Sequence, residues 1–198
     1  MPETNTLTLI STFYSFEPFV AAAHAYSPSR IYLVVAKDTL QKIDGDLNKV
    51  KEFYGGVASI EVVKVEDSDL YAIAKDTVKL LESQKGRVIV NVSGGWKLLA
   101  QGVLYGCYAR PSLVEKIICN NLADKSIVEI PKLSYGLTSA KKKLLGEIAK
   151  RNNRPIAEIA RKLSKTPGML YQHLKELRDN GYVDGKFEIT LAGKMALL

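Results

Sequence analysis

The sequence has few of the residues from which metal centres and disulfide frameworks are built. It contains two cysteines, Cys107 and Cys119, and two histidines, His24 and His173. The cysteines lack metal-ligand spacing and both lie in apolar runs, so we expect them to be small core residues. We therefore predict no structural zinc site, no other metal site and no cofactor.

Long hydrophobic runs are also missing. No stretch approaches the roughly 18 consecutive apolar residues that a membrane span needs. Residues 1–6 carry no basic segment followed by an apolar one. We therefore expect no membrane span and no signal peptide, and a cytoplasmic location.

Net positive charge is missing from the first two thirds of the chain and concentrated in the last third. Residues 132–198 hold 14 Lys and Arg against 6 Asp and Glu, a net charge of +8, whereas residues 1–131 hold 14 against 15, a net charge of −1. A basic segment joined to a near-neutral one suggests a nucleic-acid-binding domain attached to a domain with another function. We accordingly divide the chain into a first domain at 1–131, a linker at 132–137 and a second domain at 138–198.

Apolar strands alternate with amphipathic helices in the first domain. We expect strands at 6–10, 30–36, 59–65 and 87–92, and helices at 18–26, 39–53, about 69–83 and 96–105. Pro18 is expected at the first position of the first helix. This alternation predicts an α/β fold with a Rossmann-like parallel sheet, covered by helices on both faces. Two further strands, 115–119 and 126–130, lie too close in sequence for a crossover helix, so they should form a C-terminal antiparallel hairpin.

The most distinctive stretch of the first domain is Asn91-Val92-Ser93-Gly94-Gly95-Trp96-Lys97, between the fourth strand and the next helix. Free N–H groups at a helix start bind anions, and glycines allow a ligand to approach the backbone closely. Ser93 adds a hydroxyl and Lys97 a positive charge. We predict a site for a phosphate-bearing ligand, the alternative being a tight turn that serves packing alone.

Two common nucleotide motifs are absent. The sequence has no G-x-G-x-x-G after its first strand and no G-x-x-x-x-G-K-[ST] anywhere, which disfavours NAD binding and ATP hydrolysis. Ligands of parallel sheets bind beyond the carboxyl ends of the strands. The stretch Ser11-Thr12-Phe13-Tyr14 should therefore share an edge with the Ser-Gly-Gly turn. Phe13 and Trp96 are each either base-stacking or packing residues.

The second domain has the pattern of a winged helix-turn-helix: two short helices at 155–163 and 167–180, a brief turn between them, and a basic hairpin at 182–190. Thr166 should cap the second helix, which would enter the major groove of DNA. The residues expected to point into the groove are Thr166, Gly168, Met169, Tyr171, Gln172 and His173. Those expected to meet phosphates are Lys162, Lys165, Lys175, Arg178 and Lys186. A helical protein–protein domain with a solvated charged face is the alternative.

Domain order and the N-x-S-G-G-x-K stretch together resemble the CRISPR-associated Rossmann fold (CARF) regulators, and in particular the archaeal CARF–winged-helix transcription factors of type I-A systems. The resemblance implies a homodimer that binds a cyclic oligoadenylate, often the four-membered ring, across its two-fold axis. It also implies that one pocket is lined from both chains by Ser11, Thr12, Ser93, Gly94, Gly95 and Lys97, with Phe13, Tyr14, Asn91 and Trp96 in the same two segments. The family usually carries Thr or another small residue where this chain has Trp96.

Three functions are therefore compared. The first is a ligand-responsive regulator that binds double-stranded DNA and controls CRISPR-Cas genes without being an enzyme. The second is a metal-independent ring nuclease, as some CARF proteins are, in which Ser11 and Lys97 would assist attack by the ligand's own 2′-hydroxyl; no His or carboxylate of the motif is placed to act as a general base. The third is a regulator that responds to another nucleotide or to none.

Overall fold

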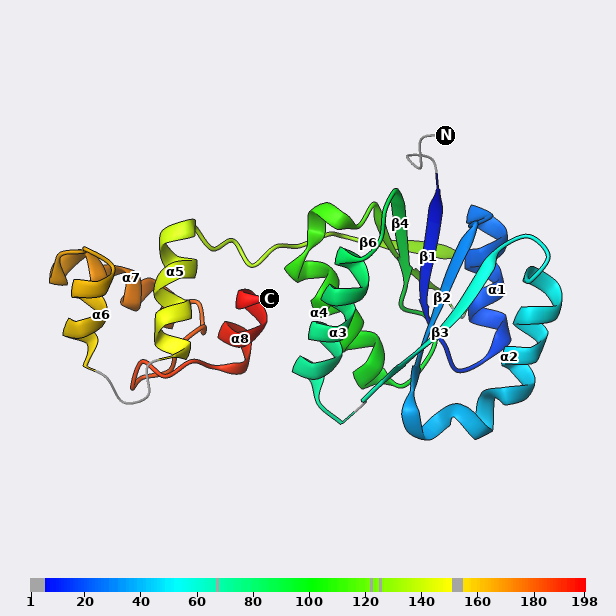
Figure 1. Cartoon of the computed structure of the whole chain (residues 1–198), viewed down its shortest axis with the longest axis horizontal. Coiled ribbons are helices and arrows are strands. Elements are labelled where there is room, and N and C mark those ends of the chain that lie inside the picture. The colour runs from blue at the N-terminus through cyan, green and yellow to red at the C-terminus, as the bar shows by residue number, and fades with distance from the viewer. Residues whose placement is uncertain (1–5, 67, 122, 125, 151–154) are drawn as a thin grey trace. The chain divides into compact units, whose positions relative to one another are not determined.

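The chain folds into two compact units, Met1–Ser134 and Tyr135–Leu198. The computed structural model describes residues 6–66, 68–121, 123–124, 126–150 and 155–198 (Figure 1). Two hydrophobic clusters lie in the first unit and a third lies in the second. Among the described residues, no helix is both long and apolar enough to cross a membrane.

A six-stranded sheet in the order β3-β2-β1-β4-β5-β6 forms the centre of the first unit. Strands β1 to β5 run parallel, and β6 is antiparallel to β5. This confirms the predicted Rossmann-like sheet with its C-terminal hairpin. The strand bounds are β1 Leu7–Thr12, β2 Arg30–Ala36, β3 Ser59–Val65, β4 Arg87–Asn91, β5 Lys116–Asn120 and β6 Ile127–Ile130.

Helices cover both faces of the sheet because successive residues of each central strand point to opposite sides. Leu9 belongs to the cluster beneath α1 (Phe16–Tyr26) and α2 (Leu40–Tyr54), whereas its neighbour Ile10 belongs to the cluster beneath α3 (Leu70–Glu82) and α4 (Lys97–Ala109). Short 3₁₀ turns precede α2 (η2, Lys37–Thr39) and follow α4 (η3, Pro111–Leu113). The solidly apolar strands are thus explained by burial on both sides.

The direction of strand addition reverses between β1 and β4. The chain builds β2 and β3 on one side of β1 and then returns to place β4 on the other side. In open α/β sheets this reversal opens a crevice beyond the carboxyl ends of the two strands, where ligands bind. Helix α4 is held against α3 at close range, since a Cβ added to Gly102 would lie 2.5 Å from the Ile73 Cβ.

The start of the first unit differs from the prediction in two places. Strand β1 continues to Thr12, two residues past its predicted end, because Ser11 and Thr12 are still paired with β2. Helix α1 begins at Phe16, so Pro18 is its third residue and not its first. Proline is accepted there because the first four N–H groups of a helix have no partner within it. The other predicted boundaries of the first unit agree with the structure to within one residue, except that α4 extends to Ala109.

Within residues 135–150 and 155–198, the second unit has four helices around one apolar cluster. Its elements are α5 Ser139–Ala149, α6 Ile156–Lys162, α7 Pro167–Asp179 and α8 Leu191–Leu197. Leu144 and Leu145 of α5 pack with Leu170 and Leu174 of α7. The Thr166 side chain caps α7, as predicted. The sequence also predicts a helix from Thr138 or Ser139 to about Arg151; α5 corresponds to it, and Arg151 itself lies outside the described residues.

The wing is less regular than the predicted hairpin. The sequence predicts a two-residue turn at Asp184-Gly185. The two segments instead meet in a single antiparallel bridge, Val183↔Ile189, and the loop between them is longer. The Asp184 carboxylate accepts hydrogen bonds from the backbone N–H groups of Lys186 and Glu188, at 2.9 and 2.8 Å. Because this side chain organises the loop, a two-residue turn is not required.

Candidate ligand site and nucleic-acid interface

Asn91, the last residue of β4, connects the segments that surround the strand ends. Its Nδ2 donates to Ser11 Oγ at 3.1 Å and to the Pro18 carbonyl oxygen at 3.2 Å. Its Oδ1 accepts from the Ser93 backbone N–H at 3.2 Å and from the Ser93 hydroxyl. Asn91 is fully buried. It therefore holds the turn in place from below and does not face a ligand in this conformation.

The predicted ligand-contacting stretch Ser11-Thr12-Phe13-Tyr14 begins within β1 and is mostly buried. Ser11 and Thr12 are enclosed in the sheet, and the Ser11 hydroxyl donates to the Thr12 carbonyl while accepting from Asn91. Phe13 is a core residue that packs edge-on against Phe19. The expected contacts of these three side chains with a ligand are therefore not available in this conformation, because continued strand pairing draws them inward. Tyr14, which is 42% exposed, is the accessible member.

Ser93 is also used within the protein. Its hydroxyl accepts a hydrogen bond from the Asn120 backbone N–H at 2.7 Å and donates to Asn91. The Asn120 side chain donates to the Pro18 carbonyl oxygen at 2.9 Å. Asn120 was absent from the predicted site. Its position at the carboxyl end of β5, the strand beside β4, is the sequence signal that points to it.

The two glycines of the turn are required by geometry. A Cβ on Gly94 would lie 2.4 Å from the Thr12 carbonyl oxygen, so no side chain fits between β1 and the turn. Gly95 has φ +79°, a conformation that L-residues seldom adopt. Both glycines are thus needed for close packing of the turn, which is the alternative to ligand binding given in the sequence analysis. They also bring the turn directly over the end of β1.

An accessible surface remains at the start of α4. Trp96 is the N-cap residue and its side chain makes no capping hydrogen bond, so no side chain of the cap occupies the N–H groups of the first turn. Lys97 follows, exposed and without an ion pair among the described residues. Trp96 is 53% exposed and packs edge-on against Tyr14, with ring centroids 6.4 Å apart. A ligand can thus reach the N-terminus of α4, the Lys97 side chain and the rings of Tyr14 and Trp96.

The structure also bears on the metal prediction. Within the described ranges, no group of three or more His, Cys, Asp or Glu side chains is placed to hold a metal ion. The absence of a cofactor stays a prediction.

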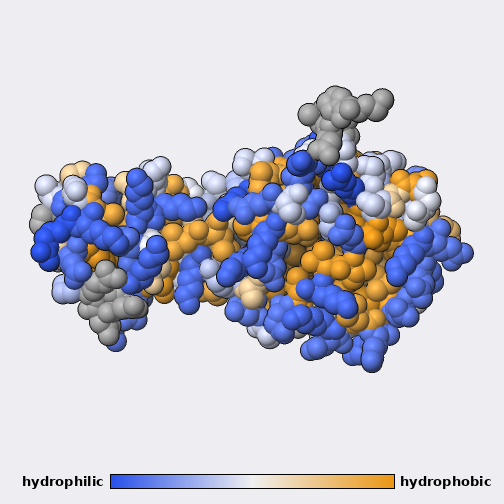
Figure 2. Space-filling view, in the orientation of Figure 1, coloured by the Kyte–Doolittle hydropathy of each residue, from blue (hydrophilic) through white to orange (hydrophobic). Residues whose placement is uncertain are grey.

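Most of the residues predicted to contact DNA are exposed on the second unit. Met169 and Tyr171 of α7 are 47% and 56% exposed. Thr166 uses its hydroxyl to accept from the Met169 N–H at 3.4 Å. Figure 2 shows hydrophilic residues over α6 and α7. The remaining exposed members are Lys165, Gly168, Gln172, Lys175, Arg178 and Lys186.

Two members of this set differ from expectation. His173 does not point freely outward: it is half-buried, it lines a cavity with residues of α5, and its Nδ1 is buried with no hydrogen-bond partner among the described residues. Its position next to the buried Leu174 turns it toward the core edge. Lys162 is exposed and forms an ion pair with Glu147 of α5, in which Nζ and the carboxylate oxygen are 2.6 Å apart.

Comparison with known proteins identifies the second unit. Residues 137–184 match a family model described as winged helix-turn-helix DNA-binding. These residues form a winged helix-turn-helix domain, as predicted. No curated protein sequence matches the chain.

Several solved structures are similar to the chain in fold. Csm6 from Enterococcus italicus, bound to cyclic hexa-2′-fluoro-hexa-dAMP, is 12% identical with a TM-score of 0.55, over 88% of this chain and 54% of that one. Protein VC1899 from Vibrio cholerae is 13% identical with a TM-score of 0.53, over 96% and 64%. Can2 from Sulfobacillus thermosulfidooxidans, in complex with cyclic tetra-adenylate, is 14% identical with a TM-score of 0.48, over 96% and 62%. The chain thus spans between about half and two thirds of the length of these proteins. The chain is thus similar in fold to Csm6 and to VC1899.

Proposed function

We propose that the chain is a transcription regulator of CRISPR-Cas genes that binds double-stranded DNA and responds to a cyclic oligoadenylate. The observation that carries the proposal is the combination, in one chain, of an uncapped helix N-terminus at the β1–β4 reversal with a winged helix-turn-helix domain. Csm6, which has a similar fold, was solved with a cyclic oligoadenylate analogue. A DNA-binding domain also favours a regulator over an enzyme.

The ligand site would be formed by two copies of the chain. A cyclic oligonucleotide carries repeated phosphates, and a two-fold arrangement of two α4 N-termini with two Lys97 side chains matches that symmetry. The outer side of α4 supports such pairing, because Lys97, Gln101 and Tyr105 are exposed at four-residue spacing. Tyr105, like Trp96, is an exposed aromatic residue of the kind enriched at interfaces.

Regulation follows from coupling between the two sites. A ligand that binds one dimer conformation better than another shifts the population toward it. The spacing of the two α7 helices would change with the dimer conformation, and DNA half-site spacing is sensitive to that distance. We also propose that the regulated CRISPR-Cas genes are those of an archaeal type I-A system.

Calorimetric titration with cyclic tetra- and hexa-adenylate tests the ligand. We expect binding by the wild type and at least tenfold weaker binding by Lys97→Ala. Lys75→Ala is the matched control, since Lys75 is an exposed lysine on α3. Equal affinities of the wild type and the Lys97 variant would refute the pocket, and binding of another cyclic nucleotide in place of oligoadenylate would refute the ligand class.

DNA binding is tested by fluorescence anisotropy with the duplex upstream of the chain's own gene, at several salt concentrations. We expect salt-dependent binding that changes when the ligand is added, and no effect of salt or ligand would contradict the regulator. The ring-nuclease alternative predicts linear products from labelled cyclic tetra-adenylate. It is weakened by Ser11, whose hydroxyl is buried and engaged in two hydrogen bonds.

A further inference from the structure

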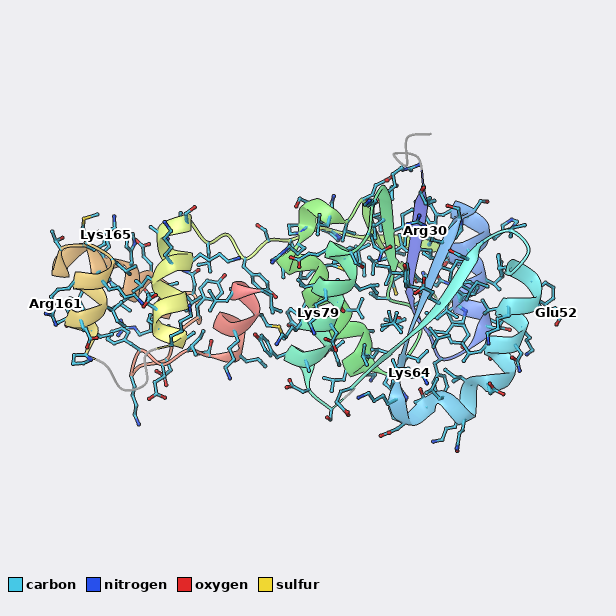
Figure 3. The ribbon with its side chains drawn as sticks, viewed as in Figure 1. Arg30, Glu52, Lys64, Lys79, Arg161 and Lys165 are labelled. Atoms are coloured by element: carbon cyan, nitrogen blue, oxygen red, sulfur yellow. The ribbon has the colours of Figure 1, made fainter. Side chains whose placement is uncertain are left out.

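Two lysines from separate elements of the second unit line one cavity. The cavity holds about 330 Å³ and is lined by Ala140, Lys143, Leu144, Leu163, Lys165, Leu170 and His173. Lys143 lies on α5, and Lys165 lies in the turn between α6 and α7, where Figure 3 labels it. The floor is apolar, so the lysines and His173 supply its polar character.

The charges along this side of α5 are balanced at one end and unbalanced at the other. Ala140, Lys143, Leu144 and Glu147 recur at helical spacing and so share one face of α5. At the Glu147 end, the carboxylate neutralises Lys162 of α6 at 2.6 Å. At the Lys143 end, neither Lys143 nor Lys165 has an ion-pair partner in the part of the chain that the structure describes, and residues 151–154 contain no acidic residue.

The neighbouring acids of α7 do not compensate these two lysines. Glu176 binds Lys141 of α5 at 2.6 Å, and Asp179 lies 3.9 Å from Arg178. His173 adds an imidazole whose Nδ1 is buried without a hydrogen-bond partner among the described residues. Two like charges at one cavity, with unused hydrogen-bonding capacity beside them, favour the binding of an anion.

We propose that Lys143, Lys165 and His173 form a phosphate site that grips the DNA backbone, so that α5 is a second DNA-contacting element beside α7. This inference rests on the proposed DNA binding and adds to it a residue, Lys143, outside the predicted interface. A lysine donates to phosphate as a compact point charge, and two of them from different elements set the position of the backbone relative to α7. The contact carries no base information.

The test uses the full chain and a mixed-sequence 20-base-pair duplex, because a backbone contact is independent of sequence. Binding is measured by anisotropy from 50 to 200 mM salt. For Lys143→Ala and Lys165→Ala we expect affinity about five- to tenfold lower at 0.1 M salt and a salt slope smaller by about 0.9 each. Lys142→Ala is the matched control: it removes the same charge from the neighbouring, exposed position of α5, which does not line the cavity.

A structural role for Lys143 would give a different result. Since the two lysines repel one another, Lys143→Ala should leave the melting temperature unchanged or higher, and Lys143→Arg should restore affinity. A lowered melting temperature together with an unchanged salt slope would overturn the proposal, as would equal effects of the Lys142 and Lys143 variants.

Inorganic phosphate provides an independent measurement of the same site. Titrated at constant pH and ionic strength, phosphate should shift the imidazole NMR signals of His173 and not those of His24, which lies in the first unit, and Lys143→Ala should abolish the shift. If the wild type binds no duplex, the proposed function is refuted, but the phosphate titration still tests whether Lys143, Lys165 and His173 bind an anion. If the lysine variants keep both their duplex affinity and their phosphate response, the site itself is refuted.

Discussion

Asn91 and Ser11 are register partners across β4 and β1, and the Asn91 Nδ2 donates to the Ser11 hydroxyl at 3.1 Å. Asn91 is the last residue of β4 and Ser11 is the last but one of β1, and the sheet reverses its order between these two strands. Polar residues at strand ends, which in the sequence suggest ligand contacts, here join the strands to the turn above them. The groups that remain accessible lie just beyond the strand ends: Tyr14, Trp96, Lys97 and the amides at the start of α4.

Replacing Asn91 by Ala should destabilise the first unit. The change removes the acceptor of the Ser93 N–H and of the Ser93 hydroxyl, and it removes one of the two hydrogen bonds of the buried Ser11 hydroxyl. Each group left unsatisfied costs about 1–3 kcal/mol. We expect the free energy of unfolding to fall by about 2–4 kcal/mol in urea denaturation. Asn48→Ala, at an exposed position of α2, should change it by less than about 0.5 kcal/mol. A similarly small effect at Asn91 would show that the network is not a structural one.

Replacing Gly94 by Ala should displace the turn. The new Cβ would lie 2.4 Å from the Thr12 carbonyl oxygen, and a backbone atom cannot yield as a flexible side chain does. We expect binding of cyclic oligoadenylate to weaken by tenfold or more in calorimetry. Gly56→Ala is the control, because nothing lies within 4 Å of its added Cβ. Wild-type affinity in the Gly94 variant would mean that the turn does not form the site.

The Cys107 thiol should be unreactive in the folded protein. Burial disfavours the thiolate and raises the pKa of Cys107 to about 12, so at pH 8 almost none of the nucleophilic form exists. In a Cys119→Ser variant we expect no labelling by a thiol-specific disulfide reagent under native conditions and one thiol per chain in denaturant. Rapid native labelling would show that α4 opens away from the sheet.

The ion pair between Glu176 and Lys141 should make the second unit sensitive to acid. The hydrogen bond from Lys141 is the main cause that lowers the pKa of the Glu176 carboxyl below 4.5. Because the folded-state pKa is the lower one, the stabilisation is present above pH 4.5 and is lost as the pH falls through the folded-state pKa. We expect Lys141→Met to raise the pKa of Glu176 in an NMR titration. An unchanged titration curve would mean that the pair is not formed in solution.

Much of the architecture follows from local chemistry. Strands buried on both faces must be apolar throughout, which is why β2 and β4 could be located from composition alone. Thr166 before Pro167 marks the start of α7, because a hydroxyl cap and a proline both suit the N–H groups that a helix leaves unpaired. The charge division between the two parts of the chain likewise needs no coordinates.

Side-chain direction at the strand ends could not be obtained in this way. Whether Ser11 faces a ligand or Asn91 depends on how far β1 remains paired with its two neighbours, which is a long-range property. Asn120 and Lys143 join their sites from elements distant in sequence, so no local pattern identifies them. Residue types and periodicity were sufficient to predict the two folds. The packing of β1, β4, β5 and α1 against one another selects which polar groups at the carboxyl ends of the strands stay accessible, because burial and hydrogen bonding within the protein occupy the others.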